Sequence, residues 1–210
     1  MKLLSVNVAM PRSVTWGGRT YATSIFKQPV EGRVTMRRLN IDGDAQSDLT
    51  VHGGADMAVY VYSDDHYPYW RTVLTAGALT PGAFGENLTV TGMTEETVHI
   101  GDSFAIGDAL VQVSEPRTPC HKLAMKYDRP SFPKEFLRTG HVGFYLRVLE
   151  PGEVGAGDEI TPVARDSAGL TVMEILRIWE KKRPSAAELD RALSVPALSA
   201  KWRGQLAERR

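Results

Sequence analysis

The stretch VHIGDSFAIGDALVQV, residues 98–113, decides the fold class of this chain, because short apolar runs alternate in it with two Gly-Asp pairs. Such pairs are typical of tight turns between antiparallel strands. Runs rich in β-branched and aromatic residues, which favour strands, recur at residues 58–62, 87–90 and 109–113. Many short strands with close turns predict a small, mainly antiparallel β-barrel, so the expected fold class is mainly β with helices.

Two short helices are expected to interrupt these strands. The first begins at Ser63, a residue type that caps helices, and Asp64 and Asp65 suit the positive end of a helix dipole. Pro68 lies early enough in this helix to be tolerated. The second helix is expected over residues 131–139.

The composition changes near residue 164, which predicts a domain boundary there. Residues 1–164 carry 15 Lys and Arg against 19 Asp and Glu, whereas residues 165–210 carry 10 against 6. Glycine is frequent before the boundary, but beyond Gly169 it occurs only at Gly204. We therefore expect a barrel domain over residues 1–164 and a small three-helix domain over residues 165–210.

Three helix starts are expected in this C-terminal part. Residues 171–174 (Thr-Val-Met-Glu) and 185–188 (Ser-Ala-Ala-Glu) have the sequence of a capping box. Pro196 suits the first turn of a third helix, on which apolar residues recur every four positions, at Leu198, Trp202 and Leu206. A helix-turn-helix DNA reader is one alternative. Its recognition helix would hold more Arg and Lys than this chain shows, so a packing or partner-binding module is favoured.

Composition argues against several classes of protein. The 25 basic and 25 acidic residues cancel, so bulk attraction to nucleic acid or to an anionic membrane is not expected. No stretch approaches the roughly 20 apolar residues that span a bilayer, and the apolar run at the N-terminus is too short for a secretory signal. The single cysteine excludes an internal disulfide and fits a reducing compartment. The expected location is the cytoplasm.

That cysteine, Cys120, lies in the segment SEPRTPCHKL, residues 114–123. Arg117, His121 and Lys122 are within three residues of it, and nearby cations favour the thiolate, which is both a nucleophile and a soft metal ligand. Two prolines just before the cysteine stiffen the segment. The alternative is an inert, buried thiol, which is the commoner state of a stray cysteine.

Several further segments offer polar groups that could bind a ligand. Glycine loops allow close approach of the backbone to a ligand, and hydroxyls with cations can hold a phosphate. The candidates are Thr23, Ser24 and Lys27; His52, Gly53, Gly54 and Asp56; Glu86 and Asn87; and His141. Each segment is also compatible with an ordinary turn or a solvated surface. The histidines do not fall at zinc-ligand spacing with the cysteine, so a structural zinc site is not expected.

Taken in order, four of these segments resemble the MOSC domain, which is found at the C-terminus of molybdenum cofactor sulfurases. They are His52–Asp56, Phe84–Leu88, Gly101-Asp102 and Glu115–Leu123. The spacing is most similar to the stand-alone bacterial YiiM-type members, which also carry a three-helix C-terminal extension. The resemblance therefore covers nearly the whole chain.

The resemblance implies a β-barrel that binds a molybdenum–pterin cofactor, with the Cys120 thiolate as a ligand to the metal. Thr23, Ser24 and Lys27 would grip the terminal phosphate of the cofactor. Arg117 and His141 would join Cys120 as catalytic residues. The remaining cofactor contacts would come from His52, Gly53, Gly54, Asp56, Glu86 and Asn87. We expect this set to converge near Cys120.

The implied activity is reduction of N-hydroxylated bases and related N-oxygenated small molecules, as in 6-N-hydroxylaminopurine detoxification. A separate flavoprotein would deliver the electrons. Met57 stands where related chains commonly have Lys, which leaves a cation at this place in doubt. Two other classes stay open. In one, Cys120 carries a persulfide for molybdenum cofactor metabolism; in the other, the barrel binds a small ligand and acts as an adaptor through its helical tail.

Overall fold

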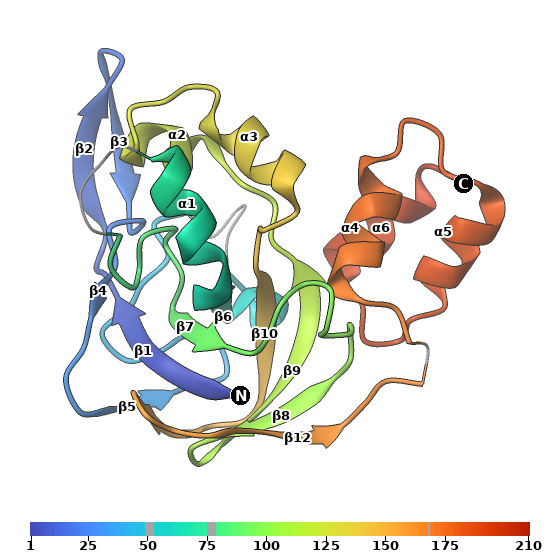
Figure 1. Cartoon of the computed structure of the whole chain (residues 1–210), viewed down its shortest axis with the longest axis horizontal. Helices are drawn as coiled ribbons and strands as arrows, with labels where there is room; N and C mark the ends of the chain where they lie inside the picture. The colour runs from blue at the N-terminus through green and yellow to red at the C-terminus, as the bar shows by residue number, and fades with distance from the viewer. Residues whose placement is uncertain (49–52, 75–78, 168) are drawn as a thin grey trace.

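A computed structural model describes residues 1–48, 53–74, 79–167 and 169–210 of the chain. Its main element there is an eight-stranded mixed sheet that curls into a half-barrel (Figure 1). The strands lie in the order β12 (Ile160–Ala164), β8 (Ser103–Ile106), β9 (Ala109–Pro116), β10 (Phe144–Glu150), β6 (Val59–Ser63), β7 (Leu88–Thr91), β1 (Lys2–Val8) and β4 (Gln28–Pro29). Neighbouring strands are antiparallel except β6 and β7, which are parallel. The predicted class, mainly β with helices, is confirmed.

Two small sheets complete the β structure. One pairs β5 (Arg33–Met36) with β11 (Gly152–Gly155), and the other is the hairpin of β2 (Arg12–Trp16) and β3 (Arg19–Thr23), which stands out from the barrel in Figure 1. The hairpin is tied to the chain just after Cys120. Trp16 Nε1 donates to Asp128 Oδ1 at 2.8 Å, and the Tyr21 ring lies 5.2 Å from that of His121.

Three helices cover one end of the half-barrel (Figure 1). They are α1 (Tyr67–Val73), α2 (His121–Lys126) and α3 (Phe132–Thr139), with short 3-10 helices at Ala55–Met57 and Asp64–His66. Both predicted helices are confirmed, although the first opens as a 3-10 turn after Ser63, whose side chain caps it. The rings of Trp70 and Phe136 stack at 5.1 Å and join α1 to α3.

One predicted hairpin is wrong. Residues 98–102 do not form a strand that turns into β8, because His99 instead makes an isolated bridge to Thr171. The buried carboxylate of Asp102 accepts from the backbone N–H groups of His99 and Asp166, so the first Gly-Asp pair anchors the connection to the tail. The second pair, at Gly107, joins β8 to β9 as predicted.

The C-terminal residues form α4 (Val172–Glu180), α5 (Ala186–Leu193) and α6 (Ala200–Ala207), and both predicted capping boxes are present. The third helix begins later than predicted. Pro196 lies in a turn, and Ser199 is the true cap, because its Oγ accepts from Trp202 N at 3.2 Å.

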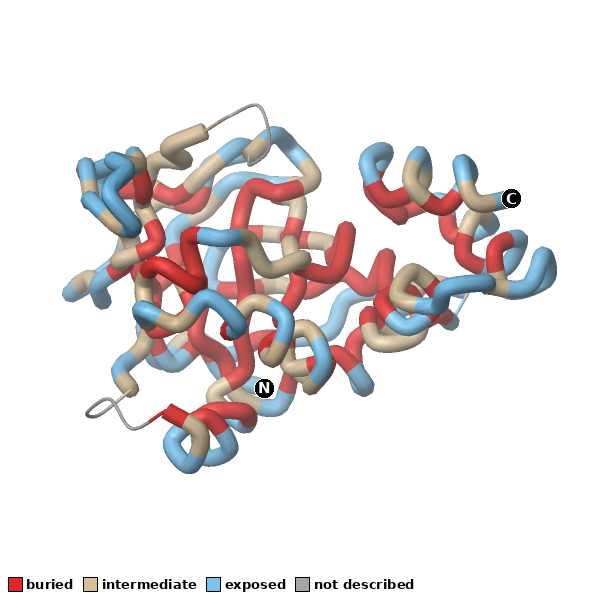
Figure 2. Tube along the Cα trace, turned by 90° about the horizontal axis from the view of Figure 1, so that it is seen from above, coloured by how far each residue is buried: buried red, intermediate tan, exposed pale blue. Residues whose placement is uncertain are grey.

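The tail helices pack onto the sheet and share its hydrophobic core. Val172, Ile175 and Trp202 are fully buried in the same cluster as the strand residues. Figure 2 shows buried positions along the strands and on the facing sides of these helices, with exposed positions outside. Backbone bonds join the two parts: Val172 N donates to Val98 O at 2.9 Å, and Ser199 N to Ser114 O at 3.1 Å. Among the described residues, no helix has the length and apolar character needed to cross a bilayer.

Candidate functional site

A cavity of about 650 Å³, including its open mouth, is lined by strand and loop residues from separate parts of the chain. Seven of the predicted site residues line it: Thr23, Ser24, Lys27, Gly53, Asn87, Arg117 and Cys120. These residues are far apart in the sequence, so the fold itself brings them together.

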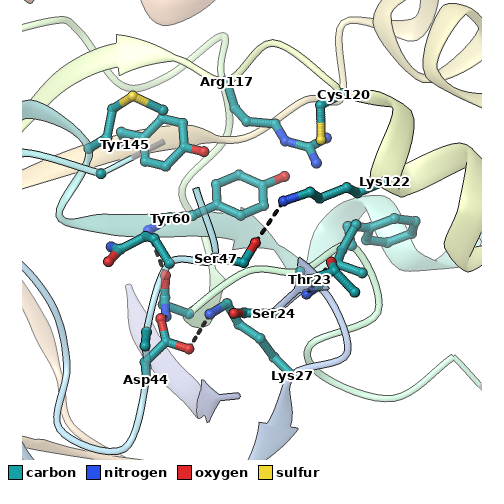
Figure 3. A pocket seen from close by; sticks show the side chains of 18 residues that line it. Thr23, Ser24, Lys27, Asp44, Ser47, Tyr60, Arg117, Cys120, Lys122 and Tyr145 are labelled. Carbon is teal, nitrogen blue, oxygen red and sulfur yellow. Dashed lines mark hydrogen bonds and ion pairs between the residues drawn. The ribbon is translucent and has the colours of Figure 1, made fainter. Parts of the chain in front are cut away.

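The cavity has two chemically different ends (Figure 3). At one end the guanidinium of Arg117 extends toward Cys120, and the hydroxyl of Tyr145 points to the same side of the cavity. At the other end lie the hydroxyls of Thr23 and Ser24 with the ammonium of Lys27. We call these the sulfur end (Arg117, Cys120, Tyr145) and the hydroxyl end (Thr23, Ser24, Lys27).

At the sulfur end, Cys120 is half-buried and directly precedes α2. Arg117 is only 5% exposed, and its carbon Cζ lies 5.0 Å from the ring centre of Tyr60. Burial alone would lower the pKa of Arg117, but the negative charge that Tyr60, Cys120, Tyr145 and Tyr62 carry when deprotonated outweighs burial and raises the pKa. Arg117 is therefore a permanent cation, and a guanidinium favours a neighbouring thiolate.

At the hydroxyl end, a buried polar network fixes the cation. Lys27 forms an ion pair with Asp44. Burial lowers the pKa of Lys27, and the carboxylate of Asp44 opposes that shift. Asp44 also accepts from Asn87 Nδ2 at 3.0 Å, while Asn87 Oδ1 accepts from Tyr60 N at 3.1 Å. The network thus joins Lys27 to the strand that carries Tyr60.

The glycine loop before β7 packs against the segment that carries the hydroxyl end. Gly82 and Gly85 have φ of +85° and +83°, and a Cβ on them would lie 2.7 Å from Lys27 O and 2.9 Å from Ile25 Cγ1. Glycine is therefore needed at both positions. Glu86 shapes this loop from inside, since its carboxylate accepts two backbone N–H groups of the loop at 2.9 Å.

Helix α2 holds these two segments together. Lys126 Nζ donates to Ile25 O at 3.1 Å and to Gly82 O at 2.7 Å, and the Tyr127 hydroxyl donates to Ala83 O at 2.9 Å. Burial lowers the pKa of Lys126 to about 8. The helix that follows the cysteine therefore positions the hydroxyl end as well.

His141 and Glu86 do not line the cavity, contrary to the expected convergence. Glu86 is fully buried behind the glycine loop. The ring of His141 stacks on that of His66 at 4.0 Å with 8° between the planes, and His66 Nε2 lies 2.7 Å from Glu95 Oε2. Burial lowers the pKa of His141. His141 therefore belongs to a second polar cluster, together with His66 and Glu95.

Asp56 and Gly54 also lie outside the cavity wall. Asp56 Oδ1 accepts from Arg147 Nη2 at 2.7 Å, and Arg147 Nη2 also donates to Ala197 O at 2.9 Å, so this carboxylate helps to fasten the tail. His52 lies outside the described residues.

Seven polar or aromatic residues of the wall were not predicted from the sequence: Asp44, Gln46, Ser47, Tyr60, Phe84, Lys122 and Tyr145. Lys122 had a signal, since it lies two residues after Cys120, and its Nζ donates to Ser47 Oγ at 2.6 Å. Asp44 had none, because a lone carboxylate after a glycine also fits a surface turn. Met57 contributes apolar surface to the same wall.

Within the described ranges, no group of three or more His, Cys, Asp and Glu side chains could hold a metal ion. Cys120 offers one soft sulfur ligand. A metal at the sulfur end would therefore need most of its ligands from a bound cofactor.

The chain belongs to the MOSC domain family, whose model matches residues 48–161. Within that family it is of the YiiM type. The crystal structure of YiiM from Geobacillus stearothermophilus is 38% identical with a TM-score of 0.84, and the match covers 99% of this chain and 98% of that one.

Two relatives add to this placement. The uncharacterized protein YflK of Bacillus subtilis (strain 168) is 41% identical over 208 residues, which are 99% of this chain and 94% of the relative. A protein named Reductase from Gibberella moniliformis is 34% identical over 197 residues, which are 92% of this chain but 35% of that longer protein.

Proposed function

We propose that this protein binds a molybdenum–pterin cofactor and reduces N-hydroxylated bases and related N-oxygenated compounds. One observation carries the proposal. Two buried polar atoms of the cavity, Arg117 Nη1 at the sulfur end and Ser24 Oγ at the hydroxyl end, have no hydrogen-bond partner among the described residues. A buried polar group left without a partner costs about 1–3 kcal/mol, so both atoms favour a ligand that reaches both ends.

The chemistry of the two ends fits that cofactor. A terminal phosphate is matched by hydroxyls and a buried ammonium, which Thr23, Ser24 and Lys27 supply. A molybdenum ion held by pterin sulfurs is matched by the soft thiolate of Cys120. Asp44 keeps Lys27 in place, and Thr23 and Ser24 line the cavity beside it.

The reduction converts R–NH–OH, two protons and two electrons into R–NH₂ and water. The bound cofactor would supply the two-electron centre, and a separate flavoprotein would be the electron source. The residues of this chain bind and orient: Arg117 holds positive charge beside Cys120, and Tyr60 gives an aromatic wall. Similarity to a protein named Reductase supports the same reaction class. The lone cysteine fits a cytoplasmic location for this activity.

A persulfide carrier is the other candidate, and the half-buried Cys120 suits it. A carrier of this kind would have no use for the hydroxyl end, although Lys27 is held there by Asp44, which also accepts from Asn87. The reductase is therefore favoured.

Metal analysis of the purified protein and of Cys120→Ala tests the proposal. Wild type should contain molybdenum and pterin and reduce 6-N-hydroxylaminopurine. Cys120→Ala should fold and lose that activity, since a half-buried thiol contributes little packing. Full turnover by the variant would exclude the metal-ligand role, and cyanide-labile sulfur without molybdenum in wild type would favour the carrier.

A further inference from the structure

Tyr145 is a cavity residue that sequence motifs do not single out. It lies near the start of β10, opposite Glu115 of β9, and the strand pairing shifts register immediately after it. Arg117 N donates to Gly143 O at 3.1 Å, so the backbone of the two strands places Tyr145 beside Arg117. The Tyr145 ring packs on that of Tyr60 at 5.4 Å.

The hydroxyls of these two tyrosines differ in what they bind. Tyr60 donates to Val142 O at 2.7 Å, which commits its proton to the backbone. Tyr145 faces the cavity at the sulfur end, where Figure 3 shows its hydroxyl directed toward Arg117. A guanidinium has no acceptor atom. Arg117 can therefore donate to the Tyr145 oxygen but cannot accept the Tyr145 proton.

A tyrosine phenol keeps its proton at neutral pH, so Tyr145 is a neutral donor there. Arg117 Nη1 is a second donor, buried and without a partner in the described part of the chain. It carries two N–H groups, so one can donate to the bound cofactor and the other to a substrate oxygen. Two donors on one side of a cavity match one ligand oxygen, which has two lone pairs.

We propose that Arg117 and Tyr145 form a donor pair that binds the oxygen of the substrate's N–O group, and that this pair distinguishes an N-hydroxylated base from its reduced product. The inference rests on the proposed function and deepens it. The amine product lacks the oxygen, so its binding leaves both donors without an acceptor. Sites that hydrogen-bond a substrate hydroxyl reject analogues that lack it, for this reason.

Equilibrium dialysis tests the pair on molybdenum-loaded protein without a reductant, so that no turnover occurs. The probes are 6-N-hydroxylaminopurine and adenine, and the readout is the ratio of their affinities. Tyr145→Phe should weaken binding of the hydroxylated base about tenfold and leave adenine binding unchanged. Its molybdenum content should equal that of wild type, because no cofactor contact is assigned to the phenol.

Tyr69→Phe is the matched control. Tyr69 is 43% exposed and does not line the cavity, so loss of its hydroxyl should leave both thermal stability and the affinity ratio unchanged. Arg117→Lys, which keeps the charge but loses the forked donor, should reduce the ratio in the same direction as Tyr145→Phe.

The outcomes separate this proposal from the proposed function. If wild type prefers the hydroxylated base and Tyr145→Phe keeps the same preference, the donor pair is refuted and the reductase stands. An equal weakening of both probes by Tyr145→Phe would also refute it, because that is the effect of a purely structural residue. If molybdenum-loaded wild type shows no preference for the hydroxylated base, both the proposed substrate class and the donor pair are refuted.

Discussion

The ion pair of Lys27 and Asp44 should be the interaction on which the hydroxyl end depends most. The two side chains are 8% and 2% exposed. Asp44→Ala would leave the Lys27 ammonium buried without its counter-ion, at the place where an anionic group of a ligand is expected. It would also remove the acceptor for Ala9 N at 2.8 Å and for Asn87 Nδ2 at 3.0 Å.

The cost follows from these contacts. Removing one partner of a buried ion pair costs about 3–5 kcal/mol. Each of the two deprived N–H donors would add about 1–3 kcal/mol if it stayed dry. Water can enter from the adjoining cavity, so the costs do not sum, and we expect about 3–5 kcal/mol in total. For a chain of this size that corresponds to a fall in Tm of roughly 6–20 °C.

Urea unfolding and molybdenum content, measured side by side, test this prediction. Asp44→Ala should lose stability and cofactor together. Burial lowers the pKa of Lys27 and the Asp44 carboxylate opposes that shift, so without Asp44 the pKa falls further and Lys27 loses the charge that would bind the cofactor's phosphate. The matched control is Asp42→Ala, two residues before Asp44. It breaks an exposed ion pair with Arg37 and should change neither readout measurably. If the two variants unfold at the same urea concentration, the structural role assigned to Asp44 is refuted.

Two further predictions concern pH. Burial lowers the pKa of Lys126 from 10.5 to about 8. Between these pH values the unfolded chain binds a proton that the folded protein does not. The free energy of unfolding should therefore rise with pH in this range, by at most about 1.4 kcal/mol per pH unit. Lys126→Met should flatten this rise in urea unfolding at pH 7 to 10, and an unchanged slope would contradict it. Burial also lowers the pKa of His141 below 6.5, so its contribution to stability is present above that pH and is lost as the pH falls below it. His141→Phe, which keeps a ring on His66, should reduce the acid loss in Tm scans; equal losses in both proteins would exclude this histidine as a cause.

The sequence predicted the parts of the structure that local physics controls. Capping boxes at Thr171 and Ser185 depend on residues within one turn, and both are present as predicted. The third helix was misplaced because Pro196 and Ser199 are both good starts, and the turn between them decides which is used. Residues 98–102 were misassigned because their partner, near Thr171, is some 70 positions away in the chain.

Site residues that are close together in the sequence could be predicted, and those that only the fold brings together could not. Arg117 and Cys120 share one rigid segment, so proximity in sequence gave proximity in space. Asp44 and Tyr145 come from other parts of the fold and carry no local pattern. His141 was expected in the cavity because a glycine loop can deliver a side chain to a site. The structure instead turns its ring to His66, where stacking and burial hold it.

The position of the tail bears on the cavity, because its contacts reach the strand that ends beside Cys120. Ser199 N donates to Ser114 O at 3.1 Å. Lys201 Nζ lies 4.0 Å from Oε1 of Glu115, and Glu115 is only 1% exposed. Burial raises the pKa of Glu115, and the ammonium of Lys201 partly opposes that shift. Glu115 precedes Arg117 by two residues, so an unsupported buried carboxylate there would disturb the backbone that aims the guanidinium. The tail therefore supports the sulfur end through the strand between them, and none of the described residues that line the cavity comes from the tail.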